Sequence, residues 1–232
     1  MLEGAGLKIR PEVLPCVLAA VLTGPVAAGA VYLSGGGAAA IEAAGLAIPV
    51  ILTGYFLYFF RDPERTPPSD PDIAVAGADG IVMRIKEMRE ERFLKTDTVR
   101  ISIFLSLFDV HVNRAPIGGE SRFLGYFRGR HLFTFQEKSS DVNQHNAILI
   151  ENERTKCLVL QIVGPVARRV VYWHDPDRPV SIVKGDRIGM MKFGSRMDIY
   201  FPKGEVEVLA REGQRVRAGE TPIAKIIGRK AL

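Results

Sequence analysis

The chain has 232 residues, 47% of them hydrophobic, which is enough to bury a sizeable core and excludes a disordered protein. Lys and Arg outnumber Asp and Glu by 31 to 26, and a net charge of +5 is too small for the dense basic stripe of a nucleic-acid-binding protein. The two cysteines, Cys16 and Cys157, have no CxxC or Cys/His spacing nearby, so we expect neither a disulfide framework nor a metal site.

Two apolar segments open the chain. Residues 13–33 carry no charge and residues 38–60 carry only Glu42, and each segment is long enough to cross the core of a bilayer. Only the sequence SGGG separates them. Two helices with so short a connection must run antiparallel, so the sequence predicts a membrane-associated helical hairpin over residues 1–60.

The charges that flank the hairpin predict its orientation. Lys8 and Arg10 precede it, and Arg61 and Arg65 follow it, so the positive-inside rule places both ends and the rest of the chain on the cytoplasmic side of the cell membrane. Two alternatives stay open. One is a cleaved signal peptide with small residues near Ala30. The other is a soluble or interfacial hairpin, which the prolines and many small residues would suit.

The sequence RDPERTPPSDPD at residues 61–72 contains four prolines and no periodicity, which predicts a linker. The remaining domain, residues 73–232, consists of short β-branched or aromatic runs about ten residues apart. A short helix is expected within residues 164–173, and no long amphipathic helix after residue 60. Strands are predicted at residues 80–88, 98–106, 146–152, 157–164, 169–173, 197–202 and 205–210.

The domain contains one short internal sequence repeat. Residues 184–194 (KGDRIGMMKFG) align with residues 218–228 (AGETPIAKIIG) at an offset of 34, which matches two pairs of glycines. This pattern of turn, strand and glycine is typical of a barrel-sandwich hybrid, the lipoyl-domain type of fold. We therefore predict a mainly β (α+β) protein, a β-rich barrel or sandwich with lipoyl-like features that follows an apolar helical hairpin.

Three polar residues are candidates for chemistry. Ser195 lies in FGSR, between KGDRIGMMK and the predicted strand MDIYFP. His111 lies in FLSLFDVHVNRAP, and Asp79 lies in AGADGIV. Taken singly, each has an ordinary structural explanation: a turn with an exposed hydroxyl, a histidine at the end of a strand, and an Asp-Gly turn.

Taken together, the segments are more specific. The chain resembles the short form of the phosphatidylserine decarboxylase proenzymes, whose signature is an FGS(R/T)-type self-cleavage site followed by a D-x-x-x-P strand, as in FGSRMDIYFP. The apolar pair, RDPER, AGADGIV, FLSLFDVHVNRAP, NAILIEN and QIVGPVARRV also follow the order of that family. The resemblance covers nearly the whole chain.

This resemblance implies self-cleavage between Gly194 and Ser195. The Ser195 hydroxyl attacks the Gly194 carbonyl, the resulting ester breaks by β-elimination, and residue 195 becomes a pyruvoyl group. That group is the expected cofactor, in place of pyridoxal phosphate or a metal. The resemblance further assigns His111 as the base and Asp79 as its orienting partner. The products, of 194 and 38 residues, are expected to stay associated.

The chain departs from the long-form relatives at one position. They carry a second histidine three residues after the first, where this chain has Arg114. The identity of the self-cleavage base therefore stays open, with Asp109 as an alternative orienting residue. No role is carried over to His145, which lies in NQHN.

The activity implied is decarboxylation of phosphatidylserine to phosphatidylethanolamine and CO₂. The pyruvoyl group would form a Schiff base with the serine amine, and His111 would reprotonate the former α-carbon. Expected partners are phosphatidylserine in an anionic membrane, with Arg61 and Arg65 as candidate lipid contacts, the two cleaved chains and a homo-oligomer, but no nucleic acid. The alternative is a membrane-anchored lipoyl-like adaptor or carrier without catalytic activity. A soluble pyruvoyl amino-acid decarboxylase would need no hairpin.

Overall fold

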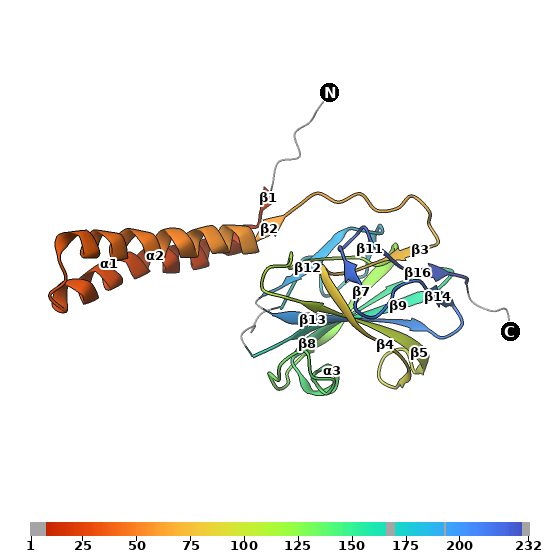
Figure 1. Ribbon diagram of the computed structural model, residues 1–232. Coiled ribbons are helices and arrows are strands. Elements are labelled where there is room, and N and C mark those ends of the chain that lie inside the picture. The colour runs from red at the N-terminus through yellow and green to blue at the C-terminus, as the bar shows by residue number, and fades with distance from the viewer. Residues whose placement is uncertain (1–7, 166–169, 193, 229–232) are drawn as a thin grey trace, which may run out of the picture. The chain divides into compact units, whose positions relative to one another are not determined.

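The computed structural model describes residues 8–165, 170–192 and 194–228 (Figure 1). The chain forms two compact units, Met1–Glu64 and Arg65–Leu232.

The first unit is a helical hairpin. It contains a 3-10 turn, η1 (Pro11–Val13), and two helices, α1 (Leu14–Leu33) and α2 (Ala38–Phe59). The strands β1 (Lys8–Ile9) and β2 (Arg61–Asp62) pair antiparallel and close its base. Both helices occupy the apolar segments that the sequence predicted.

Small residues bring the two helices close together. A Cβ atom at Gly24 would lie 2.6 Å from the carbonyl oxygen of Gly45 and 3.0 Å from Pro49 Cγ. Close backbone approach through small residues is the usual packing mode of membrane helices. By length and composition, both helices are able to cross a membrane. Their large apolar side chains are mostly exposed, among them Leu18, Leu22, Val26, Leu46, Val50 and Ile51. These exposed side chains favour a membrane-associated hairpin over one buried in a soluble core.

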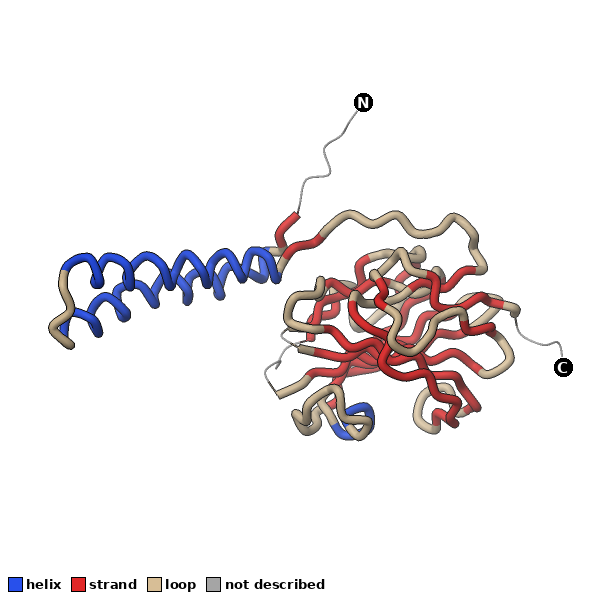
Figure 2. Tube along the Cα trace, viewed as in Figure 1, coloured by secondary structure: helices blue, strands red, loops and turns tan. Residues whose placement is uncertain are grey.

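The second unit is built almost entirely of antiparallel strands, drawn in red in Figure 2. The prediction of a mainly β domain preceded by two apolar helices is therefore confirmed. Its one described helix is α3 (Ser139–Val142). The strands are β3 (Ile73–Val75), β4 (Gly80–Glu90), β5 (Thr96–Leu105), β6 (Val112–Arg114), β7 (Gly119–Phe127), β8 (His145–Glu151), β9 (Lys156–Val163), β10 (Val170–Tyr172), β11 (Val180–Ile182), β12 (Arg187–Met191), β13 (Ser195–Pro202), β14 (Val206–Val208), β15 (Arg215–Val216) and β16 (Pro222–Ile226).

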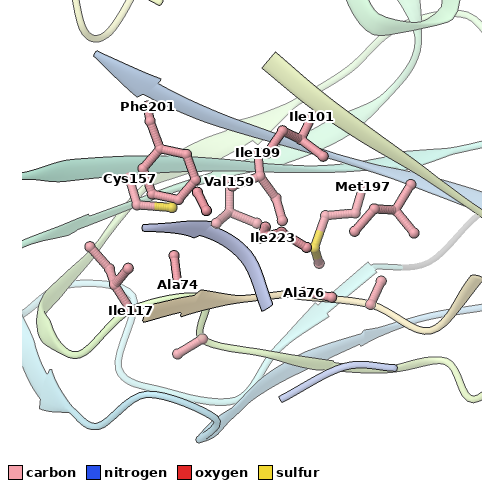
Figure 3. Close-up of a cluster of buried hydrophobic side chains, with 14 of the residues drawn as sticks. Ala74, Ala76, Ile101, Ile117, Cys157, Val159, Met197, Ile199, Phe201 and Ile223 are labelled. Atoms are coloured by element: carbon pink, nitrogen blue, oxygen red, sulfur yellow. The ribbon is translucent and has the colours of Figure 1, made fainter. Parts of the chain in front are cut away.

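The strands form one large sheet and two small ones. The eight-stranded sheet has the order β11-β7-β8-β9-β13-β5-β4-β15, and the three-stranded sheets have the orders β10-β12-β6 and β14-β16-β3. Alternate residues of β13, namely Met197, Ile199 and Phe201, enter the main core together with Ala74, Ala76 and Ile223 of the β3 and β16 region (Figure 3). Because β13 lies between β5 and β9, its first residues are fixed by neighbours on both sides.

The internal sequence repeat, residues 184–194 and 218–228, also has a repeated backbone structure. Gly185 and Gly219 both have left-handed φ values, +86° and +77°. The N–H of Gly185 donates to the Ala115 carbonyl oxygen at 2.9 Å, and the N–H of Gly219 donates to the Ala76 carbonyl oxygen at 2.8 Å. Each turn then leads into a strand, β12 or β16, which pairs with β6 or β3 respectively. The alignment of residues 184–194 with 218–228 is thus confirmed in the backbone.

The segment 61–72, expected as a linker, is divided between the two units. Its first two residues form β2, whereas Arg65 onward belongs to the second unit. Ion pairs explain this attachment, because Arg65 binds Asp79, and Asp72 pairs with Arg154. The short helix expected within residues 164–173 falls partly on residues 166–169, which lie outside the described residues, and β10 begins directly after them.

Candidate active site

Ser195 is the first residue of β13, paired with Leu105 of β5 on one side and Val163 of β9 on the other. It is fully buried, and its Oγ has no hydrogen-bond partner among the described residues. Burying a hydroxyl without a partner costs about 1–3 kcal/mol, so such a group calls for an explanation. The alternative of a turn with an exposed hydroxyl is wrong here, because the strand ladder begins at Ser195.

Two glycines lie at the peptide bond that precedes Ser195. Gly194 contributes its carbonyl group, and Gly164 lies beside that carbonyl oxygen. Gly194 has φ +72°, a conformation that side chains disfavour, although a Cβ there would meet nothing closer than Leu107 at 3.8 Å. At Gly164, a Cβ would lie 3.0 Å from the Gly194 carbonyl oxygen. One glycine therefore permits the backbone conformation, and the other leaves room beside the carbonyl. Phe193, the first residue of the FGSR motif, lies outside the described residues.

His111 lies directly before β6 and is fully buried. Its Nδ1 is 2.9 Å from the backbone carbonyl oxygen of Asp109. A carbonyl oxygen can only accept a hydrogen bond, so Nδ1 carries a proton, and in the neutral imidazole Nε2 then has the lone pair. This is the tautomer that a general base requires. The histidine is held in place further by its own carbonyl, which accepts the N–H of Met191 at 3.2 Å.

Asp79 directly precedes β4 and is held by two donors. Its Oδ1 accepts the N–H of Ala218 at 2.7 Å, and its Oδ2 accepts Arg65 Nη2 at 2.9 Å. Arg65 also donates to Glu220 at 2.8 Å. The Arg65 side chain is only 10% exposed and engages two carboxylates, so we no longer expect it to bind a lipid phosphate. The role of Asp79 as the orienting partner of His111 stays a prediction.

The strand register brings two of the candidates, Asp79 and Ser195, to one end of the large sheet. Ile81 pairs with Phe104 and Ser195 with Leu105, so Asp79 and Ser195 flank the same end of β5. With strands about 4.8 Å apart, their backbones are separated by about 10 Å. The strand that follows His111 reaches this end too, because its last residue, Arg114, donates its N–H to Gly77 at 2.8 Å.

The side chains of Asp109 and Arg114 are engaged in hydrogen bonds and ion pairs with other residues than His111. The Asp109 carboxylate accepts the Ser106 N–H and hydroxyl at 2.8 and 2.7 Å and pairs with Arg215 at 2.8 Å. Burial acts to raise the pKa of Asp109, but these hydrogen bonds and this cation outweigh it and hold the pKa below its ordinary value. It is thus the carbonyl of Asp109 that holds His111. Arg114 donates to the Gly185 carbonyl at 2.8 Å and, as a permanent cation, cannot act as a base.

His145 lies on the opposite face of the large sheet from Ser195. It pairs with Ile162 of β9, which in turn pairs with Arg196, the residue after Ser195. Since side chains alternate between the two faces of a sheet, His145 points away from the Ser195 side. Its ring packs on Phe127, and burial lowers its pKa, more than its hydrogen bond to the Asn143 carbonyl raises it. This arrangement agrees with giving His145 no role.

A buried ion pair that the sequence analysis missed fixes the start of β13. Arg196 and Asp198 are at most 1% exposed and meet at 2.6 Å between Nε and Oδ1. Arg196 also donates to Ser102 of β5 at 2.9 Å, and Asp198 accepts the Ser140 hydroxyl of α3 at 2.7 Å. The available signal was the pair of opposite charges two residues apart in an otherwise apolar strand.

An apolar pocket of about 190 Å³ opens beside the candidate cleavage site. Segment 131–135 supplies much of the wall of this pocket. The sequence analysis predicted no strand or helix there. The lining residues are Phe104, Leu107, Phe133, Thr134, Phe135, Pro165 and Gly194.

The chain is similar to known proteins over most of its length. The family model described as phosphatidylserine decarboxylase matches residues 52–224. A phosphatidylserine decarboxylase proenzyme from Carboxydothermus hydrogenoformans is 45% identical over 174 residues, which cover 75% of this chain and 81% of the relative. Another from Solibacter usitatus is 43% identical over 186 residues, covering 80% and 86%, and one from Chlorobium phaeobacteroides is 41% identical over 189 residues, covering 82% and 84%.

Proposed function

The chain belongs to the phosphatidylserine decarboxylase family, and we propose that it matures by cutting itself between Gly194 and Ser195 and then decarboxylates phosphatidylserine to phosphatidylethanolamine at the membrane. The observation that carries this proposal is the buried Ser195 hydroxyl, without a hydrogen-bond partner among the described residues, next to the left-handed Gly194. The adaptor alternative finds no support, because relatives of such high identity are named as decarboxylase proenzymes.

In the proposed maturation, His111 Nε2 takes the proton of the Ser195 hydroxyl. The oxygen attacks the Gly194 carbonyl carbon, the peptide C–N bond breaks, and the Ser195 nitrogen takes up a proton as the amine of an ester. Loss of the Cα proton of residue 195 then expels the Gly194 carboxylate, which becomes the end of the long chain. The remaining dehydroalanine exchanges its nitrogen for the oxygen of water, releases ammonia and leaves a pyruvoyl group.

The surroundings of residue 195 suit that group. The position is buried and begins a central strand of the large sheet. Once formed, the pyruvoyl group supplies a ketone that condenses with the primary amine of the serine head group and takes up the electrons released as CO₂ leaves. His111 would return a proton to the former α-carbon, and Asp79 would keep the imidazole oriented.

The sheet pairing supports lasting association of the two chains after the cut. The 38-residue chain would carry β13, which is paired with β5 and β9 of the long chain. Its β15 and β16 pair with β4 and β3, also of the long chain. Separation would break these four strand ladders and open the core.

We further propose that the hairpin anchors the enzyme with its catalytic unit on the cytoplasmic side. Lys8, Arg10 and Arg61 lie at the base of the hairpin, as the positive-inside rule requires. Extracting a diacyl lipid costs about 0.8 kcal/mol per CH₂ exposed to water, so an enzyme for its head group should work at the membrane surface.

The test compares the wild type with Ser195→Ala on a denaturing gel and in a CO₂-release assay with phosphatidylserine. The wild type should appear as two chains of 194 and 38 residues, and the variant as one inactive chain. Ser181→Ala, a serine exposed on β11, is the matched control and should cut and turn over normally. An uncut wild type that still releases CO₂ would overturn the proposal.

A further inference from the structure

Four large apolar side chains stand exposed around the mouth of the pocket beside Gly194. Leu107 is 42% exposed, Phe108 66%, Phe133 55% and Phe135 60%. Leu107, Phe133 and Phe135 line the pocket, and Phe108 follows in the same turn. We call these four residues the aromatic rim. Single exposed apolar residues are ordinary, but a cluster around a pocket is typical of a binding surface.

The rim is presented by ordered loops. The Asn143 side chain both accepts the Leu132 N–H at 3.0 Å and donates to the Leu132 carbonyl at 2.7 Å. Thr134, between the two phenylalanines, is buried. The Phe133 and Phe135 rings stack with centroids 5.3 Å apart. The residues beside the two phenylalanines are thus anchored, and the fold presents both rings to solvent.

Basic residues flank Phe133 and Phe135 in the sequence. The segment 128–138 exposes Arg128, Arg130, His131 and Lys138. Its one described acidic residue, Glu137, is engaged by Lys86 at 2.8 Å. Among the described residues, no carboxylate pairs with Arg128 or Arg130. Aromatic side chains flanked by arginine and lysine are the composition that binds anionic lipid surfaces.

We propose that the aromatic rim docks on the anionic leaflet that holds the substrate and inserts Phe133 and Phe135 at the boundary between head groups and acyl chains. The pocket would then open into the leaflet, so that a head group reaches residue 195 while its acyl chains stay in lipid. The identity of the substrate rests on the proposed function. The hairpin keeps the chain at the membrane, whereas the rim determines which face of the catalytic unit meets it.

The first test measures docking without activity. Full-length Ser195→Ala carrying Phe133→Trp is reconstituted into vesicles of phosphatidylcholine and phosphatidylserine whose acyl chains are brominated. The matched control carries Val183→Trp, a residue 66% exposed beside the other end of β7. Because β7 has nine residues at about 3.3 Å each, the two sites lie roughly 25 Å apart.

The tryptophan at position 133 should be quenched at least about two-fold more than the one at position 183, since only the rim enters the lipid. The native Trp173 contributes the same background to both variants. Equal quenching at the two positions would overturn the proposal, and so would protection of position 133 by a second copy of the chain. Because this chain is uncut, the result is independent of whether the enzyme decarboxylates.

The second test compares substrates. The double variant Phe133→Ser/Phe135→Ser should lose at least about ten-fold more kcat/KM on phosphatidylserine in vesicles than on a dispersed short-chain phosphatidylserine. An equal loss on both substrates would overturn docking, because the rim would then serve only the substrate molecule or the fold. If the double variant fails to cut itself, Phe108→Ser tests the same ratio from outside the pocket. A wild type inactive on both substrates would instead overturn the proposed function.

Discussion

Gly194 and Gly228 end the two copies of the internal repeat with similar left-handed φ values, +72° and +89°. In the first copy, the next residue begins a central strand and is the buried Ser195. The second copy ends beyond β16, which pairs only with β3 and β14 of a small sheet. The same backbone turn is therefore followed by a hydroxyl only in the first copy, where Ser195 is buried. On the proposed function, this hydroxyl, and not the turn alone, makes the first copy a cleavage site.

Removing the base should have the largest effect. General-base assistance contributes about 10²- to 10⁴-fold, so His111→Ala should accumulate as uncut chain over a time in which the wild type matures completely. The measurement is a time course of cleavage by denaturing gel after rapid synthesis. His174→Ala, which removes a half-buried histidine outside the pocket-lining segments, is the control and should cut normally.

A different result would reassign His111. If His111→Ala cuts normally but turns over poorly, the residue serves only the reprotonation step. If Asp79 and His111 act as a unit, Asp79→Asn should resemble His111→Ala, and the double variant should cut little more slowly than either single variant. Full cleavage and full turnover in His111→Ala would remove it from the site.

The two glycines offer a direct comparison between the copies. Gly194→Ala and Gly228→Ala should each cost about 1 kcal/mol of stability, because both place a side chain at positive φ. Only Gly194→Ala should also slow cleavage, by about ten-fold or more, because the strain would shift the carbonyl that Ser195 attacks. Thermal unfolding and the cleavage time course, measured on both variants, separate the two effects. Equal cleavage rates would show that the turn conformation at Gly194 is only structural.

Crowding the carbonyl should have a smaller effect. The Cβ of Gly164→Ala would lie 3.0 Å from the Gly194 oxygen, so attack there should slow several-fold while the fold persists. Gly118→Ala is the matched control, because its Cβ would lie 3.3 Å from the backbone nitrogen of Lys184, away from the cleavage site. If both variants mature at the same rate, free space beside the carbonyl does not limit the reaction.

The smallest effect concerns pH. The folded chain lowers the pKa of Asp109 below its ordinary value of 3.8, so this carboxylate stabilises the fold above that value. Its contribution is lost as the pH falls through the lowered pKa. Asp109→Asn should therefore flatten the acid side of the curve of melting temperature against pH, between about pH 5 and pH 2. If the melting temperature of Asp109→Asn falls at low pH as steeply as that of the wild type, the contacts of Asp109 with Ser106 and Arg215 add no net stability.

The sequence supported predictions where composition or order carries the information. Two apolar segments, with Glu42 as their one charged residue, predicted α1 and α2, and short β-branched or aromatic runs predicted most of the large sheet. The matching glycines of residues 184–194 and 218–228 predicted the repeat. The order of the family segments then singled out Ser195, His111 and Asp79 before any geometry was known.

Other features have no signature in the sequence. The partner of His111 Nδ1 is a backbone carbonyl, which any residue could supply. Arg65 lies in a proline-rich stretch typical of a linker, yet it pairs with Asp79 because the chain folds back over the domain. Nothing in the sequence distinguishes Phe133 and Phe135 from buried phenylalanines, and only their exposure identifies the rim. Long-range contacts and solvent exposure, in short, depend on the tertiary fold.

The most direct test of the central claim is the intact mass of the short chain from wild-type protein. Cleavage by the proposed route predicts a chain of residues 195–232 that is lighter by one ammonia than the same chain with an N-terminal serine, and that resists N-terminal sequencing. Borohydride should add two hydrogens to its ketone and abolish decarboxylation. A short chain that begins with an intact Ser195, or a fully active protein with no cut after Gly194, would contradict the account.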